Sequence, residues 1–444
     1  MHSESTGGGI VPKEKLNYIM GNPPFVGASM MTKEQKEQAV EIYGKIKLSN
    51  SIDYVGAWYH LAAKIIDQTN IKAAFVSTNS ITQGEQVSPL WGKLLDEYKL
   101  HIDYAYKTFK WNSEASEKAA VHCVIIGFSQ CENKKKRLLY SDSRIQEVSN
   151  ISPYLLDAPN VLVSSTSKPL CNVPKMLLGN KPADGGNLIL SQEEKDAVLV
   201  KEPNLIEYIH PYIGAVEYIN NKIRYCLWLK GISPTIIRNS PELMRRCERV
   251  REMRLASTAA PTREKAAIPW EFFFVSQPET NYLLVPSTSS ENRRYVPIGF
   301  MDPNVIASNS TTIVPEATLY IFGVLTSNVH MAWMRTVGGR LKSDYRYSGG
   351  IVYNTFPWPT PTPEQKARIE QTAQAILDAR ALYPDCSLAD LYDDVAMPPE
   401  LRRAHQMNDK AVMQAYGFDI KTTTESSCVA ELMKMYLDLI QQGK

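Results

Sequence analysis

The chain as far as Cys131 alternates between short apolar runs and amphipathic stretches, a pattern typical of an α/β domain. The apolar run Leu16–Met20 predicts a buried strand that must stop before Pro23 and Pro24, because proline cannot donate a ladder hydrogen bond. Three further apolar runs predict strands, and three stretches with helical apolar spacing predict helices. The strands are expected at 72–77, 101–106 and 119–128, the helices at 33–47, 51–67 and 87–98, and a loop at 107–118.

After Cys131 the pattern changes twice. A polar run beginning at Glu132 is followed by irregular sequence, which ends in the stiff, proline-rich linker 356–361. Beyond the linker the apolar spacing is helical, with few strand signals. We therefore expect an α/β domain, a mixed α+β domain and a helical domain. Their expected bounds are 1–150, 151–361 and 362–444.

The composition narrows the class of protein without identifying it. A hydrophobic share of 44% and a charged share of 22% are those of an ordinary soluble protein. The net charge of +2 is nearly neutral, so binding of nucleic acid would depend on local basic patches. The seven cysteines include no Cys-x-x-Cys pair, so we expect reduced thiols and no metal site. No apolar run is long enough to span a bilayer, and we expect a cytoplasmic protein without membrane contact.

The sequence Asn22-Pro23-Pro24-Phe25 directly follows the first predicted strand. Open α/β sheets bind ligands at the carboxyl ends of their strands. The Asn22 side-chain oxygen and the Pro23 carbonyl can accept the two N–H groups of an exocyclic amine, and the prolines add no competing donor. Phe25 offers a stacking face to a base flipped out of a duplex. Taken alone, Asn-Pro-Pro is more often a simple turn.

Five longer stretches carry a more specific signal than this tetrapeptide. They are Tyr18–Phe25, Phe75–Gly84, Phe109–Ala115, Gly338–Ser348 and Tyr353–Pro359. Together they resemble the MmeI-like (type IIL restriction-modification) family of adenine-specific DNA methyltransferases. The resemblance implies methyl transfer from S-adenosylmethionine to a flipped adenine, with Asn22, Pro23, Pro24 and Phe25 as the catalytic residues. It also implies that Trp111, Asn112 and Glu114 line the rim of the adenine pocket.

The sequence also departs from the family it resembles. Full-length members carry a nuclease, a helical spacer and a Gly-rich cofactor loop before the pocket motif, whereas only Met1–Lys15 precede the strand here. Gly7, Gly8 and Gly9 follow no predicted strand, so a flexible tail is the simpler interpretation. We therefore expect a partial class I (Rossmann-like) methyltransferase domain without its cofactor-binding half, and we assign no cofactor-binding residue. Binding of S-adenosylmethionine is not expected from this chain alone, and a separate chain carrying the missing half is one way to complete it.

A basic segment from Arg335 to Arg346, with interleaved tyrosines, is the candidate surface for reading double-stranded DNA. Its candidate DNA-binding residues are Arg340, Lys342, Asp344 and Arg346. In the family that the sequence resembles, residues at the positions of Lys342 and Asp344 help select one base pair. Lysine donates to guanine and aspartate accepts from cytosine, so the two side chains suit opposite bases of one G·C pair. The alternative interpretation is a solvated loop.

Two other functions stay open at this point. Glutamine side chains and RNA bases are also methylated over such pockets, so the substrate can be a protein or RNA. The chain can also be a DNA-binding or specificity fragment without catalysis. The arginine-rich helix predicted at 241–255 contains glutamates three or four residues from its arginines and is interpreted as a solvated face. Arg293 and Arg294 are equally compatible with phosphate contacts and with an ordinary loop.

Overall fold

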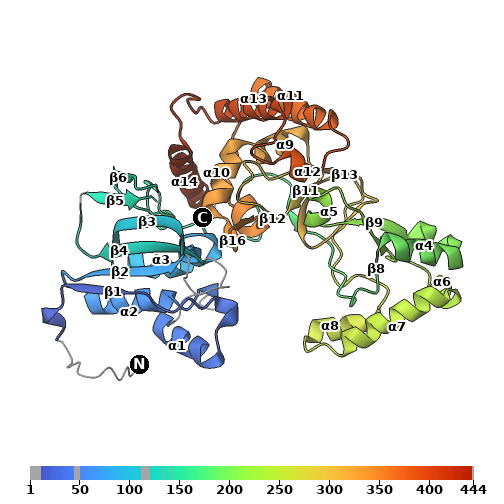
Figure 1. The fold of residues 1–444 in the computed structure, drawn as a ribbon, viewed down its shortest axis with the longest axis horizontal. Helices are drawn as coiled ribbons and strands as arrows, with labels where there is room; N and C mark the ends of the chain where they lie inside the picture. Colours follow the sequence, from blue (N-terminus) through green and yellow to red (C-terminus); the bar gives the residue numbers. More distant parts are fainter. Residues whose placement is uncertain (1–11, 45–50, 112–120, 134, 141, 443–444) are drawn as a thin grey trace. The chain divides into compact units, whose positions relative to one another are not determined.

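The computed structural model describes residues 12–44, 51–111, 121–133, 135–140 and 142–442. The chain forms two compact units, which we treat separately (Figure 1). Unit 1 comprises residues 1–165, 336–343 and 424–444. Unit 2 comprises residues 166–335 and 344–423. Two late segments of the chain therefore return to the unit that contains the Asn-Pro-Pro-Phe sequence.

Unit 1 is built on a six-stranded sheet in the order β1-β2-β4-β3-β5-β6. The strands are β1 (Tyr18–Gly21), β2 (Lys72–Thr78), β3 (His101–Trp111), β4 (Val121–Ser129), β5 (Lys136–Leu139) and β6 (Ile145–Val148). β1 is parallel to β2, and β4 is antiparallel to both β2 and β3. The carboxyl ends of β1, β2 and β3 consequently lie along one edge of the sheet. Among the described residues, β1 has no strand partner on its other side.

Helices α2 (Gly56–Ile66) and α3 (Val87–Asp96) lie against this sheet (Figure 1). Tyr59 of α2 joins the layers, because its ring centroid lies 5.3 Å from that of Phe75 on β2 and 5.7 Å from that of Trp91 on α3. The same ring stacks on Phe128 of β4 at 5.2 Å. All four rings are buried, and such aromatic pairs add roughly 0.5–1.5 kcal/mol each beyond their burial. α1 (Lys33–Tyr43) begins at a capping box formed by Thr32 and Gln35.

The α/β prediction for this part of the chain is confirmed, but the bounds of α2 and β3 and the expected burial of the first strand were wrong. Tyr18 and Met20 of β1 are 66% and 78% exposed, because β1 is the edge strand of the described sheet. α2 starts at Gly56 and not at 51, because Asp53 and Tyr54 bond to distant segments and fix a turn before the helix. β3 continues to Trp111, which takes up the first five residues of the loop expected at 107–118, because Phe109 and Trp111 pair with β4; residues 112–118 lie outside the described residues. Local apolar spacing does not reveal either set of long-range bonds.

Unit 2 has mixed α and β structure, as expected. Two four-stranded sheets have the orders β14-β9-β10-β8 and β13-β11-β15-β7. The strands are β7 (Leu177–Leu178), β8 (Ile189–Leu190), β9 (Ile209–Ile213), β10 (Arg224–Leu227), β11 (Tyr282–Pro286), β12 (Thr288–Ser289), β13 (Gly299–Met301), β14 (Ile306–Ala307), β15 (Thr311–Pro315) and β17 (Asp344–Arg346). The helices before the linker are α4 (Gln192–Lys201), α5 (Ala215–Ile219), α6 (Pro234–Asn239), α7 (Pro241–Leu255), α8 (Ala260–Glu264), α9 (Leu319–Leu325) and α10 (Asn328–Val337), whose end reaches into unit 1.

The arginine-rich helix α7 is only partly the solvated face that its charge spacing predicts. Arg249 and Arg251 are exposed, whereas Arg246 and Arg254 are buried. Arg254 donates to five backbone carbonyls at 2.7–3.1 Å. They belong to Pro182, Ala183, Lys265, Ile268 and Glu271. The prediction was wrong for these two arginines because spacing along a helix shows charge balance and not depth.

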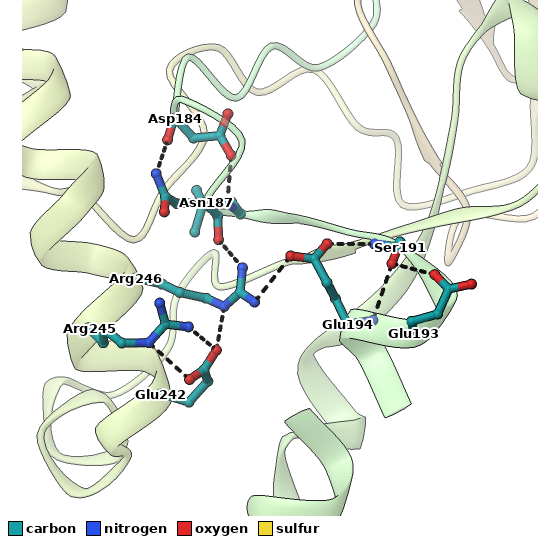
Figure 2. A network of polar contacts seen from close by, with 9 residues as sticks. Asp184, Asn187, Ser191, Glu193, Glu194, Glu242, Arg245 and Arg246 are labelled. Carbon is teal, nitrogen blue, oxygen red and sulfur yellow. Dashed lines mark hydrogen bonds and ion pairs between the residues drawn. The ribbon is translucent and has the colours of Figure 1, made fainter. Parts of the chain in front are cut away.

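Arg246 joins helix α7 to the turn before α4 (Figure 2). Its guanidinium donates to Glu242 at 2.7 Å and to the carbonyl of Asn187 at 2.8 Å, and it lies 3.9 Å from Glu194. Glu194 also accepts the N–H of Ser191 in the capping box of α4. These bonds satisfy the buried charge on several sides, which a buried arginine requires.

The helical prediction for the end of the chain is confirmed. The helices are α11 (Pro363–Ala381), α12 (Leu388–Leu391), α13 (Pro399–Ala415) and α14 (Glu425–Gln442). Asp409 of α13 accepts the Tyr295 hydroxyl and the Asn328 N–H, each at 2.7 Å, and burial raises its pKa to about 6. α14 belongs to unit 1, where the Tyr436 hydroxyl accepts the N–H of Ser164 at 3.2 Å. In the described part of the chain, every helix falls short of the length and apolarity needed to cross a membrane.

Candidate base pocket and recognition segment

The carboxyl edge of the unit 1 sheet carries the Asn-Pro-Pro-Phe sequence. Gly21, the last residue of β1, pairs with Phe75 of β2, so Asn22 stands immediately beyond the paired part of the strand. Pro23 is buried, Asn22 and Pro24 are exposed, and Phe25 is half-buried. The backbone of the tetrapeptide is therefore anchored at Pro23, while the Asn22 amide is open to a ligand.

A carboxylate that sequence reasoning missed joins the two loops at this edge. The Asp53 Oδ1 atom accepts the backbone N–H of Ala28 at 2.8 Å, and its Oδ2 atom accepts the Ser80 hydroxyl at 2.5 Å. Ala28 begins the 3-10 helix Ala28–Met30 in the segment that follows Phe25, and Ser80 lies in the 3-10 helix Asn79–Thr82 that follows β2. One side chain thus holds both loops, each of which continues from the carboxyl end of a parallel strand.

Asp53 is itself fixed by the loop after β2. Its backbone N–H donates to the Gln86 side-chain oxygen at 2.8 Å, and its carbonyl accepts the Tyr43 hydroxyl at 3.2 Å. The neighbouring Tyr54 N–H donates to the carbonyl of Val26 at 2.9 Å, which ties the pocket loop a second time. The loop that carries Asn22 is therefore bonded through both a backbone and a side chain of residues 53–54.

The core beneath this edge of the sheet contains buried groups whose pKa values are raised. Tyr59 and Ser77 share a buried hydrogen bond at 2.8 Å, and burial holds the pKa of Tyr59 well above its ordinary value. Burial likewise raises the pKa of Cys123, which pairs in register with Thr78 at the end of β2. These groups stay uncharged at neutral pH and pack beneath the sheet.

Of the residues predicted at the pocket rim, the structure describes one. Trp111 ends β3 and is 44% exposed. The register places Ala105 of β3 level with Gly21, so Trp111 lies beyond the sheet edge that carries the Asn-Pro-Pro-Phe sequence. The adjoining strands are separated by about 4.8 Å, and three such steps put β3 roughly 14 Å from β1. Asn112 and Glu114 lie outside the described residues.

The four residues predicted to read DNA lie within residues 339–346, which we call the recognition segment. It consists of β16 (Gly339–Leu341), a two-residue turn and β17. The chain passes from unit 1 to unit 2 after Ser343, so Arg340 and Lys342 belong to unit 1, and Asp344 and Arg346 belong to unit 2. Lys342 is exposed in the turn with a left-handed φ of +59°. Arg340 donates to the carbonyl of Ser343 at 2.9 Å.

The unit 2 side of the recognition segment packs on the loop before Tyr295. Asp344 accepts the N–H of Glu291 at 3.4 Å, and Arg346 pairs in register with Thr288 of β12. Burial lowers the pKa of Arg293, and Asp344 is the first of the nearby charges that oppose this shift. Arg293 is therefore a neighbour of Asp344, whereas Arg294 is exposed beside the Tyr295 ring at 5.6 Å.

Comparison with known proteins assigns the chain to a family. Family models described as the MmeI DNA-methyltransferase domain, target recognition domain and C-terminal domain match residues 3–141, 157–360 and 361–442. DNA methyltransferase A of Bacillus subtilis (strain 168) is 41% identical over 426 residues, which are 96% of this chain and 48% of that protein. The solved structure of the type IIL restriction-modification enzyme MmeI with DNA is 47% identical, with a TM-score of 0.91 over 97% of this chain and 58% of the other.

This chain therefore spans about half the length of the relatives it matches. The three models follow one another along nearly all of it, in agreement with the resemblance found in the sequence. The chain belongs to the MmeI family, whose DNA-methyltransferase, target recognition and C-terminal domain models match it in succession.

Proposed function

We propose that this chain supplies the adenine pocket and the DNA-reading segment of a site-specific, adenine-N6 DNA methyltransferase. The observation that carries the proposal is the placement of Asn22 at the carboxyl end of β1, exposed and followed by a buried proline. Asp53 and Tyr54 both bond to this loop, and the Asn22 amide is nevertheless exposed, which favours a binding role over a simple turn.

In this function the pocket acts by positioning. The Asn22 side-chain oxygen and the Pro23 carbonyl accept the two N–H groups of the adenine N6 amine, which leaves the nitrogen lone pair free to attack a methyl group. Phe25 provides a half-buried ring for the flipped base, offsetting part of the unstacking cost of a few kcal/mol. Trp111, Asn112 and Glu114 stay proposals for the pocket rim.

The methyl donor implied by the family is S-adenosylmethionine. The chain's one Gly-x-Gly sequence, Gly7-Gly8-Gly9, lies outside the described residues. The described residues thus do not fit the Gly-rich loop expected to hold this cofactor. In this proposal the described residues serve the base side of the reaction.

We further propose that the recognition segment contacts DNA, with Arg340 and Arg346 near phosphates and Lys342 and Asp344 at one base pair. The proposed division of labour keeps the bounds derived from the sequence. Residues 1–150 contribute the catalytic half-domain, 151–361 the DNA-reading domain and 362–444 a helical domain. The solved relative is described as a complex with DNA, which supports duplex DNA as the partner.

The test is methyl transfer to duplex DNA by this protein, alone and mixed with the part of the Bacillus subtilis relative that the chain does not match. Sequencing should find N6-methyladenine in one short sequence context, and the Asn22→Ala variant should leave none. Methylation of RNA or of glutamine side chains in the same mixtures would overturn the proposed substrate. Sequence-specific DNA binding with no methylation in either mixture would identify a non-catalytic DNA-binding protein instead.

A further inference from the structure

We propose that Asp53 is a positioning residue of the adenine pocket, which keeps Asn22 in place by bonding two loops at once. The inference rests on the proposed function. Both carboxylate oxygens are used, Oδ1 on the Ala28 N–H and Oδ2 on the Ser80 hydroxyl. Hydrogen bonds to an ionised acceptor are about twice as strong as those between neutral groups.

The two bonded loops are far apart in sequence and adjacent at the sheet edge. Ala28 is 25 residues from Asp53, and Ser80 is 27 residues from it. Ala28 begins the 3-10 helix Ala28–Met30 and Ser80 lies in the 3-10 helix Asn79–Thr82, so each bond joins a short helix to a residue of another segment. Their joint effect is to fix the backbone between Phe25 and Ala28 relative to β2. An asparagine that must meet an amine at hydrogen-bond distance depends on such fixing, because a displacement of about 1 Å can cost about a hundredfold in rate.

The test uses Asp53→Ala and Asp53→Asn, with Asp96→Ala as the control. Asp96 is an exposed aspartate of the same unit, on α3. Asp53→Ala should lower kcat for methylation about tenfold or more and leave the Kd for DNA within about twofold. Asp53→Asn should recover most of kcat, because its amide oxygen still accepts the Ala28 N–H and its NH2 group can donate to Ser80. A duplex with 2-aminopurine at the target adenine should show a smaller fluorescence rise with Asp53→Ala than with Asp96→Ala.

Equal kcat for Asp53→Ala and Asp96→Ala would overturn the inference, as would a loss confined to DNA affinity. Hydrogen exchange keeps the inference testable if the proposed function itself fails. In that measurement Asp53→Ala should speed exchange in both 25–30 and 78–86, and leave α3 and β4 unchanged. Unchanged exchange in these two loops would contradict the role of Asp53, whatever substrate the protein has.

A second inference, carried by a different contact, concerns Gly84. Gly84 is buried and has a left-handed φ of +69°. A Cβ atom built on it would lie 3.1 Å from the Cα of Gly339, where β16 begins. We infer that this close backbone contact seats β16, the unit 1 part of the recognition segment, on the loop after β2. That loop also supplies Ser80 and Gln86 to Asp53, so the same residues support the pocket and the strand leading to Lys342.

Gly44 provides a matched control for a Gly84→Ala variant. It has a similar φ of +64°, and its Cβ atom would meet no atom of the described residues within 4 Å. Both alanines place a side chain at a positive φ, and the one at Gly84 also presses on Gly339. Gly84→Ala should reduce the ratio of methylation at the preferred site to methylation at single-base variants of that site by about tenfold relative to Gly44→Ala. Equal ratios for the two variants at matched folded fractions, measured by circular dichroism, would overturn the role of the contact.

Discussion

The proposed base pocket and the recognition segment differ in how their functional side chains are held. In the first, hydrogen bonds from distant residues anchor the backbone that carries Asn22, whereas in the second Lys342 is exposed in a short turn. The loop after β1 is bonded through Asp53 and Tyr54, and its key amide is exposed on an anchored backbone. Lys342 is an exposed side chain in a two-residue turn, held through its neighbours. A pocket for one substrate atom benefits from rigidity, whereas a side chain that reads a base edge can be exchanged without altering its support. The comparison predicts that changes in the pocket abolish methylation and that changes in the segment redirect it.

The largest effect is expected for Asn22→Ala. Removing the side-chain acceptor should lower the rate of methyl transfer on the order of a thousandfold, comparable to the loss of one preorganised hydrogen-bonding group in other enzymes. The Kd for DNA should stay within a few-fold. Asn17→Ala, an exposed asparagine just before the same strand, is the matched control. An Asn22→Ala variant that keeps its rate of methyl transfer and changes its preferred DNA site would contradict this difference between pocket and segment.

Next in size is Arg254→Ala, which tests whether unit 2 depends on its buried arginine. Five carbonyls would lose their donor at once, and we expect a loss of roughly 3 kcal/mol in the free energy of unfolding of unit 2. Arg251→Ala, an exposed arginine on the same helix, should change it by less than about 0.5 kcal/mol. Urea denaturation of both variants measures the difference, and equal midpoints would show that α7 is merely a solvated helix.

Exchange of the recognition pair is expected to redirect methylation. The double variant Lys342→Glu and Asp344→Arg should change the preferred base pair at one position of the site, by about tenfold to a hundredfold. The maximal rate on the new preferred site should stay close to the original rate. Sequencing of methylated adenines in a random-sequence library measures both quantities. An unchanged site with an unchanged rate would remove these two residues from DNA reading.

The smallest expected effect concerns pH. Burial raises the pKa of Asp409 to about 6, above its ordinary value of 3.8, so the folded state favours the protonated carboxyl. The resulting stabilisation is fully present below pH 3.8 and is lost as the pH rises through 6. Relative to Asp409→Asn, the wild-type protein should gain on the order of 2 kcal/mol when the pH falls from 7 to 4. Thermal unfolding at several pH values tests this, and parallel curves would contradict it.

The elements that could be predicted from the sequence are those marked by neighbouring residues along the chain. The prolines after β1 and the apolar alternation predicted the α/β domain, and helical spacing predicted α11, α13 and α14. What it missed depends on contacts between distant residues. From the sequence, Asp53 is an acidic residue in the first turn of the helix expected at 51–67, and its bonds to Ala28 and Ser80 exist only in the folded chain. The hydroxyl-rich sequence after β2 was the one available hint, since it falls in a stretch that resembles the family. Burial of Arg254 gave no sequence signal at all.

The most direct test of the central claim is a structure of the protein bound to a duplex that contains its preferred site. We expect one adenine to be flipped out of the DNA duplex, with its N6 atom within hydrogen-bond distance of the Asn22 side-chain oxygen and the Pro23 carbonyl. The recognition segment should lie at base edges of the same duplex. A flipped base held elsewhere, or a duplex bound with every base stacked and Asn22 facing solvent, would contradict it.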